Sequence, residues 1–274
     1  MDSVLVGPGR AGLGLALRLL ECGHAITGVL ARDPSAASAA ADRLQSHALS
    51  WGADLPAADL LVLAVRDDAI AEVAERLAPH AGAVGGAVHL SGVGPVGLLG
   101  PLAAAGLAVG SFHPLQTLPT PEAGAARLEG AWVGVSTDDD LFADRLFSLA
   151  ASIGMRPFEL ADDAKPLYHA AAAAAANYTL AALGLSERLF EAAGVPFEAA
   201  GPLVEAVIRN ALEMGAGEAL TGPISRGDVG TVARQVAAVR GLDPALGEDF
   251  VALGRMAARM AGTEEQMREA LEGR

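Results

Sequence analysis

The stretch VLVGPGRAGLGLALRLLECGHAI, residues 4–26, runs from an apolar segment into closely spaced glycines and then into an amphipathic helix. Gly7-Pro8-Gly9-Arg10-Ala11-Gly12 fits the pattern G-x-G-x-x-G between a predicted strand and a predicted helix. Here Gly7 permits a tight turn, Gly9 lets the backbone approach a diphosphate, and Gly12 lets the helix pack closely on the strand. The amino end of the helix adds free N–H groups and a partial positive charge. Residues 7–12 are therefore predicted to bind a dinucleotide.

The rest of the chain divides into two parts. Up to about residue 160, β-rich segments alternate with helical ones, which is typical of a parallel sheet with crossover helices. We expect strands at residues 3–6, 25–30, 60–64, 87–90, 108–111, 132–135 and 156–160, and helices near residues 10–22, 34–46, 69–78, 95–105 and 141–152. Residues 165–194 predict one long Ala-rich helix, and prolines with nearby glycines divide the remainder into four more helices. The prediction is an α/β fold, a Rossmann-type parallel sheet (residues 1–162) followed by an all-α domain (163–274).

Composition limits the classes of function. Hydrophobic residues make up 52% of the 274 residues and charged residues 19%, as in a soluble globular protein. Apolar stretches end well before the ~20 residues that a bilayer span needs, so we expect no membrane segment. Met1-Asp2-Ser3 leads directly into a strand without a signal peptide, which favours a cytoplasmic enzyme. The net charge of −14 disfavours nucleic acid but not a small anionic ligand, whose binding a few local cations decide.

The second predicted strand ends where a dinucleotide's ribose is recognised. An acidic residue at this tip favours NAD, whereas an Arg accommodates the 2′-phosphate of NADP. Arg32, with Ser35 as a helper, favours NADP, and Asp33 leaves NAD open. A solvated loop charge is the alternative interpretation of Arg32.

Two further segments, LAVRDDAI (63–70) and HLSG (89–92), end predicted strands at the edge where open α/β sheets bind ligands. Ala64 and Val65 are expected to line the nicotinamide-ribose side. Asp67 either contacts the cofactor or caps the helix that begins near residue 69. Ser91 and Gly92 are expected to contact substrate.

Hydride transfer at an alcohol carbon needs a group that gives or takes a proton. His113 follows a predicted strand in SFHPLQTL (111–118), which also supplies Gln116 as a substrate contact. Lys165 and His169 lie one helical turn apart, roughly 6 Å, and can share a ligand. Asn177 lies roughly 18 Å from Lys165 along the axis, too far for one small substrate to bridge both. The catalytic candidates are Ser91, His113, Lys165, His169 and Asn177, although each histidine also fits a structural role.

In the helical half, TGPISRGDVGTVARQV (221–236) combines a helix break with a polar corner. Asp228 can cap the next helix, and Arg226 suits a bidentate contact with a substrate carboxylate. A capped helix start with a surface Arg is the alternative. We therefore count Asn177, Arg226 and Asp228 among the expected substrate contacts and assign no residue to a metal ion.

The segments GPGRAG, LAVRDDAI, HLSG, SFHPLQT, YHAAAAAAANY and GPISRGD together resemble, over essentially the whole chain, the Rossmann-like oxidoreductases with a C-terminal DUF2520 domain. That group is related to pyrroline-5-carboxylate reductases, β-hydroxyacid dehydrogenases and prephenate dehydrogenases. The resemblance implies an NADP-type cofactor and a homodimer through the helical domain, and some members resemble alternative ketopantoate reductases. Prephenate dehydrogenases carry a similar His-Pro, which implies that His113 contacts the reacting hydroxyl. The β-hydroxyacid dehydrogenases carry Asn four residues after the helix Lys, where this chain has His169.

The leading hypothesis is an NADP-dependent reductase of a small 2-keto or 3-keto acid, with ketopantoate as one candidate. His113 or Lys165 protonates the alkoxide, and Ser91, Asn177 and Arg226 orient the substrate. Two alternatives stay open: an imine reductase of the pyrroline-5-carboxylate type, and a protein that binds NADP without turnover.

Overall fold

The computed structural model describes residues 1–272. They form two compact units, Met1–Ala173 and a helical unit that begins at Ala174. The strands are β1 (Asp2–Val6), β2 (Ala25–Leu30), β3 (Leu60–Leu63), β4 (Gly86–His89), β5 (Ala108–Leu115), β6 (Trp132–Ser136) and β7 (Arg156–Glu159). The helices of the first unit are α1 (Arg10–Glu21), α2 (Pro34–Arg43), α3 (Ile70–Leu77), α4 (Gly100–Ala104), α5 (Pro121–Leu128), α6 (Asp140–Ser152) and α7 (Lys165–Ala173). The first unit continues past residue 162, where we expected the helical domain to begin, because Lys165 at the start of α7 is fully buried in it.

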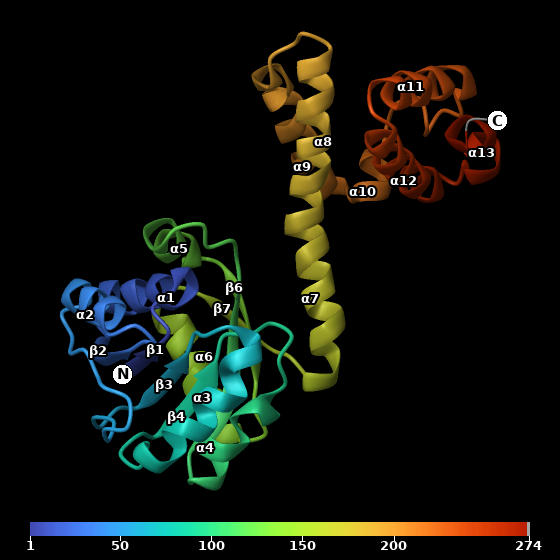
Figure 1. Cartoon of the computed structure of the whole chain (residues 1–274). Coiled ribbons are helices and arrows are strands. Elements are labelled where there is room, and N and C mark those ends of the chain that lie inside the picture. Colours follow the sequence, from blue (N-terminus) through green and yellow to red (C-terminus); the bar gives the residue numbers. More distant parts are fainter. Residues whose placement is uncertain (273–274) are drawn as a thin grey trace. The chain divides into compact units, whose positions relative to one another are not determined.

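The seven strands form one sheet in the order β2-β1-β3-β4-β5-β6-β7 (Figure 1). All seven expected strands are present, and β1 to β5 are parallel to one another. The expected parallel sheet is confirmed with one exception: β6 pairs with β5 antiparallel, and β7 is parallel to β6.

The antiparallel direction of β6 is explained by α5, a helix between β5 and β6 that we did not predict. A Cβ added to Gly14, in the first turns of α1, would lie 3.4 Å from the carbonyl oxygen of Pro121 at the start of α5. The helix thus packs against the first half of α1, which starts at the sheet edge where β1 and β5 end. The chain re-enters the sheet from the edge that it has just left, and β6 must run antiparallel.

Alternate strand residues enter two hydrophobic cores on opposite faces of the sheet. The core that includes residues of α1 and α6 contains Leu5, Val62 and Phe112, and the core that includes residues of α3 and α4 contains Val4 and Leu61. Each fully buried Leu contributes roughly 1.5–3 kcal/mol of stability. Because neighbouring residues alternate, His113, next to Phe112, points to the face that carries α3 and α4.

The second unit is helical in the part of the chain that the structure describes. Its helices are α8 (Thr179–Ala192), α9 (Gly201–Met214), α10 (Ala216–Ala219), α11 (Val229–Leu242), α12 (Pro244–Ala261) and α13 (Glu264–Glu272). A π-helical turn, Ala174–Tyr178, interrupts the expected long helix between α7 and α8. Five helices follow α8 rather than the four expected, because Gly215 separates the short α10 from α9.

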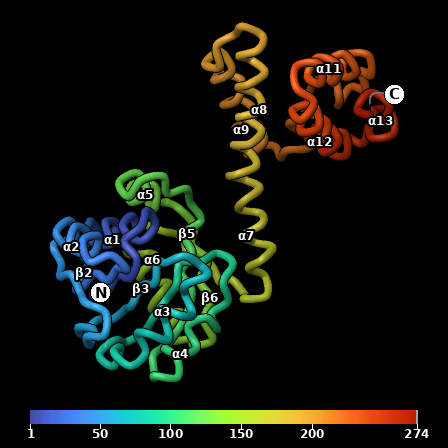
Figure 2. The backbone as a smooth tube through the Cα atoms, viewed as in Figure 1, coloured from blue at the N-terminus to red at the C-terminus, as the bar shows by residue number. Residues whose placement is uncertain are grey.

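The three C-terminal helices α11, α12 and α13 lie together (Figure 2). They share a hydrophobic core that includes Val232, Val251 and Met267. In contrast, neither α8 nor α9 contains a buried residue. Within residues 1–272, no helix is both long enough and apolar enough to cross a membrane.

Candidate functional site

The glycine-rich loop joins β1 to α1, and two of its glycines are required by the fold itself. Gly7 has φ +89°, and a Cβ there would lie 2.7 Å from the carbonyl oxygen of Ala64. At Gly12 a Cβ would lie 2.5 Å from the carbonyl oxygen of Gly7. Both positions exclude a side chain, for the reasons expected from the sequence.

Gly9 differs from its neighbours, because a Cβ there would meet no atom within 4 Å. Helix α1 begins after Gly9 with no side-chain cap and no acidic residue in its first turn. The first N–H groups of α1 have no partner within the helix, and the space beside Gly9 is open. This loop fits a diphosphate. Pro8 and Ala11 are half-buried, and Arg10 is exposed and makes no hydrogen bond or ion pair with any described residue.

The strand register brings the predicted segments to one edge of the sheet. Val6 pairs with Leu63, Leu63 with His89, and His89 with Ser111. The residues that follow these positions are the glycine-rich loop, Ala64-Val65, Ser91-Gly92 and His113. His113 lies within β5 rather than after it, because the antiparallel pairing with β6 extends β5 to Leu115.

At the tip of β2, the structure separates the roles of three polar residues. Asp33 caps α2, accepting hydrogen bonds from the backbone N–H of Ser35 at 2.9 Å and from its hydroxyl. These bonds hold the pKa of the Asp33 carboxyl below its usual value. Arg32 is exposed and has no hydrogen-bond or ion-pair partner among residues 1–272. It is therefore the side chain that this tip leaves free for a ligand.

The two aspartates after β3 do not cap the next helix by their side chains. Asp68 accepts hydrogen bonds from Arg66 at 3.0 and 2.8 Å. Burial lowers the pKa of His89 and of His113, and the negative charge of Asp67 partly opposes this lowering. Asp67 makes no side-chain hydrogen bond or ion pair with another described residue, and its contact with a cofactor stays a prediction.

His113 is the centre of a cluster that joins β5, the loop after β4 and α7. Its Nδ1 lies 2.8 Å from the hydroxyl oxygen of Tyr168, and its ring meets that of His169 edge-on at 6.0 Å between centroids. A Cβ on Gly92 would lie 2.7 Å from Nε2 of His113 and 2.6 Å from Cδ2 of His169. Only a glycine at position 92 lets the loop approach both rings so closely.

His113 and Tyr168, which are both partly buried, are uncharged at neutral pH. Burial, followed by the positive charge of His169, lowers the pKa of His113 to about 4. Burial raises the pKa of Tyr168 to about 12. At pH 7 the pair is therefore a neutral imidazole beside a neutral phenol.

Ser91 and His89 stabilise the loop after β4. The hydroxyl of Ser91 accepts hydrogen bonds from the N–H of Gly94 at 2.8 Å and of Val93 at 3.3 Å. Nδ1 of the buried His89 accepts from the N–H of Ser91, so its ring hydrogen lies on Nε2 and faces the carbonyl oxygen of Pro95 at 3.2 Å. Burial lowers the pKa of His89 to about 4. His89 is thus a structural histidine, and the Ser91 hydroxyl hydrogen remains available to a ligand.

Lys165, a predicted proton donor, is 0% exposed. Its ammonium nitrogen lies 2.6 Å from Oδ1 of Asp162 and donates to the carbonyl oxygen of Gly94 at 2.9 Å. Burial lowers the pKa of Lys165, and Asp162 opposes this shift. His169, four residues later, is exposed. The two side chains therefore do not share an open space in this structure.

The remaining predicted site residues are Gln116 in the first unit and three residues of the second unit. Gln116 binds its own loop, donating to the carbonyl oxygen of Arg127 at 3.4 Å and accepting from the N–H of Thr117 at 2.8 Å. Asp228 caps α11 through the N–H of Thr231, and this bond lowers its pKa. Asn177 and Arg226 are exposed and, like Asp228, belong to the second unit. Their substrate contacts stay predictions.

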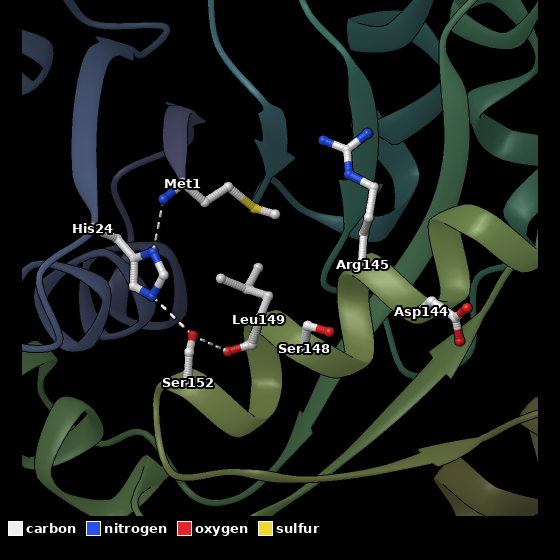
Figure 3. Close-up of a pocket in the computed structure, with 7 residues that line it drawn as sticks. All are labelled: Met1, His24, Asp144, Arg145, Ser148, Leu149 and Ser152. Carbon is white, nitrogen blue, oxygen red and sulfur yellow. Dashed lines mark hydrogen bonds between the residues drawn. The ribbon is translucent and has the colours of Figure 1, made fainter.

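A hollow of ≈ 380 Å³ lies at the opposite edge of the sheet, where β1 and β2 begin (Figure 3). His24 lies in it between two partners, with Nδ1 3.0 Å from the amino nitrogen of Met1 and Nε2 2.8 Å from the hydroxyl of Ser152. Burial lowers the pKa of His24. Both ring nitrogens are satisfied, so His24 is a structural residue far from the glycine-rich loop.

Sequence reasoning missed two members of the site. Tyr168 is not among the predicted site residues, although it directly precedes a predicted site histidine. Asp162 is not among them either, although a Lys follows it at the i+3 spacing of a helical ion pair. The spacing of Asp162 and Lys165 was a signal in the sequence, whereas the contact of Tyr168 with His113 depends on the sheet topology.

Two family profiles match adjacent parts of the chain. The "Rossmann-like domain" matches residues 2–114, and the "Domain of unknown function (DUF2520)" matches residues 131–257. The chain is a Rossmann-like protein with a C-terminal DUF2520 domain. No curated protein sequence matches this DUF2520 protein.

Several solved structures share its fold. A candidate NADP oxidoreductase from Bacteroides fragilis is 22% identical, with 94% of this chain and 98% of that chain covered and a TM-score of 0.80. A protein from Thermotoga maritima is 24% identical over 94% and 98% of the two chains, with a TM-score of 0.70. An imine reductase from Streptomyces aurantiacus is 18% identical over 100% and 99%, with a TM-score of 0.70. At these identities the likeness establishes the fold.

Proposed function

We propose that this DUF2520 protein is an NADP(H)-dependent reductase of a small keto acid, with ketopantoate among the candidates. The observation that carries the proposal is the His113–Tyr168 pair, which lies at the same sheet edge as the open glycine-rich loop. The Bacteroides fragilis structure, named for NADP, supports the choice of cofactor class.

The cofactor would be held by the first unit. The amino end of α1 and the uncrowded backbone at Gly9 receive the diphosphate. Arg32, free at the tip of β2, accommodates a 2′-phosphate, and Ala64 with Val65 borders the loop from β3. When bound, the nicotinamide supplies the hydride.

His113 supplies the proton in this proposal. Because the phenol O–H is the better donor of the two neutral groups, Tyr168 donates to Nδ1, and the ring hydrogen of His113 lies on Nε2. Nε2 of His113 gives its proton to the nascent substrate alkoxide, and at the same time Tyr168 gives its hydroxyl proton to Nδ1. The resulting tyrosinate takes a proton from water, which the half-buried position of Tyr168 permits.

Reduction of a cyclic imine is the second candidate function. It is favoured by the full-length likeness to the Streptomyces aurantiacus imine reductase and by the neutral state of His113. An iminium substrate already carries its proton, so a neutral histidine suffices to orient it.

The test is a binding titration with NADPH and NADP⁺, followed by a panel of 2-keto acids, 3-keto acids and cyclic imines with NADPH consumption as the readout. We expect His113→Ala to lower kcat for a keto acid by about 10²–10⁴-fold and to change NADPH affinity by less than about threefold. His47→Ala, at an exposed histidine, is the control. Unchanged turnover in His113→Ala would remove His113 from the reaction, and binding without turnover of any substrate would favour the non-catalytic alternative.

We also propose a homodimer through the helical unit. Helix α9 has no buried residue, yet five of its apolar side chains are exposed, namely Leu203, Val207, Ile208, Leu212 and Met214. Several exposed apolar side chains on one helix are typical of a protein–protein interface. A second copy of α9 offers a self-complementary apolar surface.

A further inference from the structure

We infer that Asp162 and Lys165 form a clamp that holds the loop Ser91–Pro95 against His113 and His169, which makes Lys165 a positioning residue rather than a proton donor. The role in catalysis rests on the proposed reductase function, whereas the clamp itself is a property of the free protein. We call this pair the Asp162–Lys165 clamp.

The clamp binds the chain after β4 at two points. Lys165 donates to the carbonyl oxygen of Gly94 at 2.9 Å, and Oδ2 of Asp162 accepts from the N–H of Val96 at 2.8 Å. The other carboxylate oxygen, Oδ1, lies 2.6 Å from the Lys165 ammonium. One ion pair therefore satisfies a backbone acceptor and a backbone donor that are two residues apart.

The position of this loop determines the space beside the catalytic candidate. Gly92 approaches Nε2 of His113 so closely that a Cβ would lie 2.7 Å from it. Nε2 is the nitrogen that His113 does not direct toward Tyr168. A displacement of the loop by an ångström would therefore change which atoms can reach Nε2, and misplacement on this scale can cost about 10²-fold in rate.

The surroundings of Lys165 oppose direct proton transfer to a substrate. The residue is 0% exposed, and two of its three N–H donors are already directed at Asp162 and Gly94. Loss of its proton would leave Asp162 as a carboxylate without its partner. Removing one member of such a pair is costly, because the other charge is left uncompensated.

The clamp also contributes an electrostatic effect that an experiment can follow. Burial is the main cause of the lowered pKa of His113; of the neighbouring groups His169, Asp67, Lys165 and His89, the positive charge of Lys165 adds to that lowering. Replacing Lys165 by an uncharged residue should therefore raise the pKa of His113. A packing role alone would not produce this change.

The test uses the full-length protein without cofactor or substrate. Lys165→Met keeps the length of the side chain and removes the charge, and Lys165→Arg keeps the charge. Asp162→Ala removes the other member of the pair, which is more exposed than Lys165, and this variant is used if Lys165→Met does not fold. Arg268→Met, in the exposed i,i+3 pair with Glu265, is the matched control.

We expect Lys165→Met and Asp162→Ala to speed amide hydrogen exchange at Gly94 and Val96 by about tenfold or more, with partial recovery in Lys165→Arg. By NMR titration, the pKa of His113 should rise in Lys165→Met and stay unchanged in Arg268→Met. Unaltered exchange in both Lys165→Met and Asp162→Ala would overturn the clamp.

Kinetics then separate positioning from chemistry. A positioning role predicts that Lys165→Arg restores most of the kcat lost in Lys165→Met, with NADPH affinity retained. A loss of about 10²–10⁴-fold in Lys165→Met, with native exchange and an unchanged His113 titration, would identify Lys165 as the proton donor and overturn the inference. Because exchange and titration need no cofactor, failure to bind NADPH would refute the proposed function alone.

Discussion

The hydroxyl oxygen of Tyr168 lies 2.8 Å from Nδ1 of His113, although 55 residues separate them in the chain. One comes from the fifth strand and the other from the helix that follows the sheet. The contact sets which nitrogen of His113 faces Gly92, and with it the direction in which a proton can leave.

Tyr168→Phe should lower kcat by about 10-fold or more, because the phenol proton no longer moves to Nδ1. The ring contact of Tyr168 with Phe158, at 5.9 Å between centroids, is retained in the variant, so the unfolding free energy should change by only about 1 kcal/mol. Steady-state kinetics and urea denaturation measure the two effects. Wild-type turnover would show that the pair carries no proton.

Gly9→Ala should separate ligand binding from folding. Its backbone angles, φ −77° and ψ −173°, suit any residue, and the added Cβ meets no atom, so stability should change by less than about 1 kcal/mol. The methyl group would instead meet the diphosphate, and NADPH affinity should fall by about tenfold or more. Gly12→Ala should show the opposite balance, losing about 1–3 kcal/mol of stability through overpacking. Undiminished NADPH affinity in Gly9→Ala would place the cofactor elsewhere.

Arg32→Ala should weaken NADPH binding by about 10-fold or more and leave NADH binding within about threefold, because only NADPH carries the 2′-phosphate. Titration by nucleotide fluorescence measures both constants. Arg209→Ala, at another exposed arginine without a described partner, is the control. Equal losses for the two nucleotides would contradict the role of Arg32 in selecting NADP.

Stability should fall as the pH drops from about 6.5 toward 4. Burial lowers the pKa values of His89 and His113 to about 4, below the value of ~6.5 in an unfolded chain. In that window the unfolded state binds more protons, so each histidine reduces the unfolding free energy by roughly 1 kcal/mol per pH unit. Above pH 7 both are neutral in both states and contribute no slope. Urea denaturation at several pH values should show a smaller slope in His89→Gln than in the control His47→Gln, and equal slopes would contradict the assignment.

Leu212→Asp should convert a dimer into a monomer. Leu212 is 84% exposed on α9, where a carboxylate would be desolvated by a second copy. Light scattering after size exclusion measures the mass. Leu141→Asp, at a residue 78% exposed on α6, should leave the mass unchanged. A monomeric wild type, or a dimer that survives Leu212→Asp, would argue against this interface.

The strands and the glycine-rich loop were predictable because their signals are local. Gly7 and Gly12 follow from backbone geometry and close packing, which the spacing of the motif already expresses. The helix α5 also had a local signal, since Thr120 caps it and Pro121 occupies its first turn, but the prediction did not include it.

The direction of β6 and the environment of Lys165 were not predictable in the same way. Both depend on contacts between distant segments, α5 with α1 in one case and Asp162 and Lys165 with residues 94–96 in the other. Helical periodicity predicts that Lys165 and His169 lie on one face of the helix. It does not predict that Lys165 is buried, because that burial depends on contacts with distant parts of the chain.

The antiparallel entry of β6 has a consequence for how the chemistry is assembled. Since β6 and β7 run against β5, the polypeptide leaves β7 at the level of Phe112 and not beyond the far rim of the sheet. The next helix, α7, then brings an aromatic hydroxyl to His113 within a single turn of its start. If β6 and β7 ran parallel to β5, the chain would leave β7 beyond the opposite edge of the sheet. Tyr168 would then lie away from His113, and the imidazole would lack its hydrogen-bond partner.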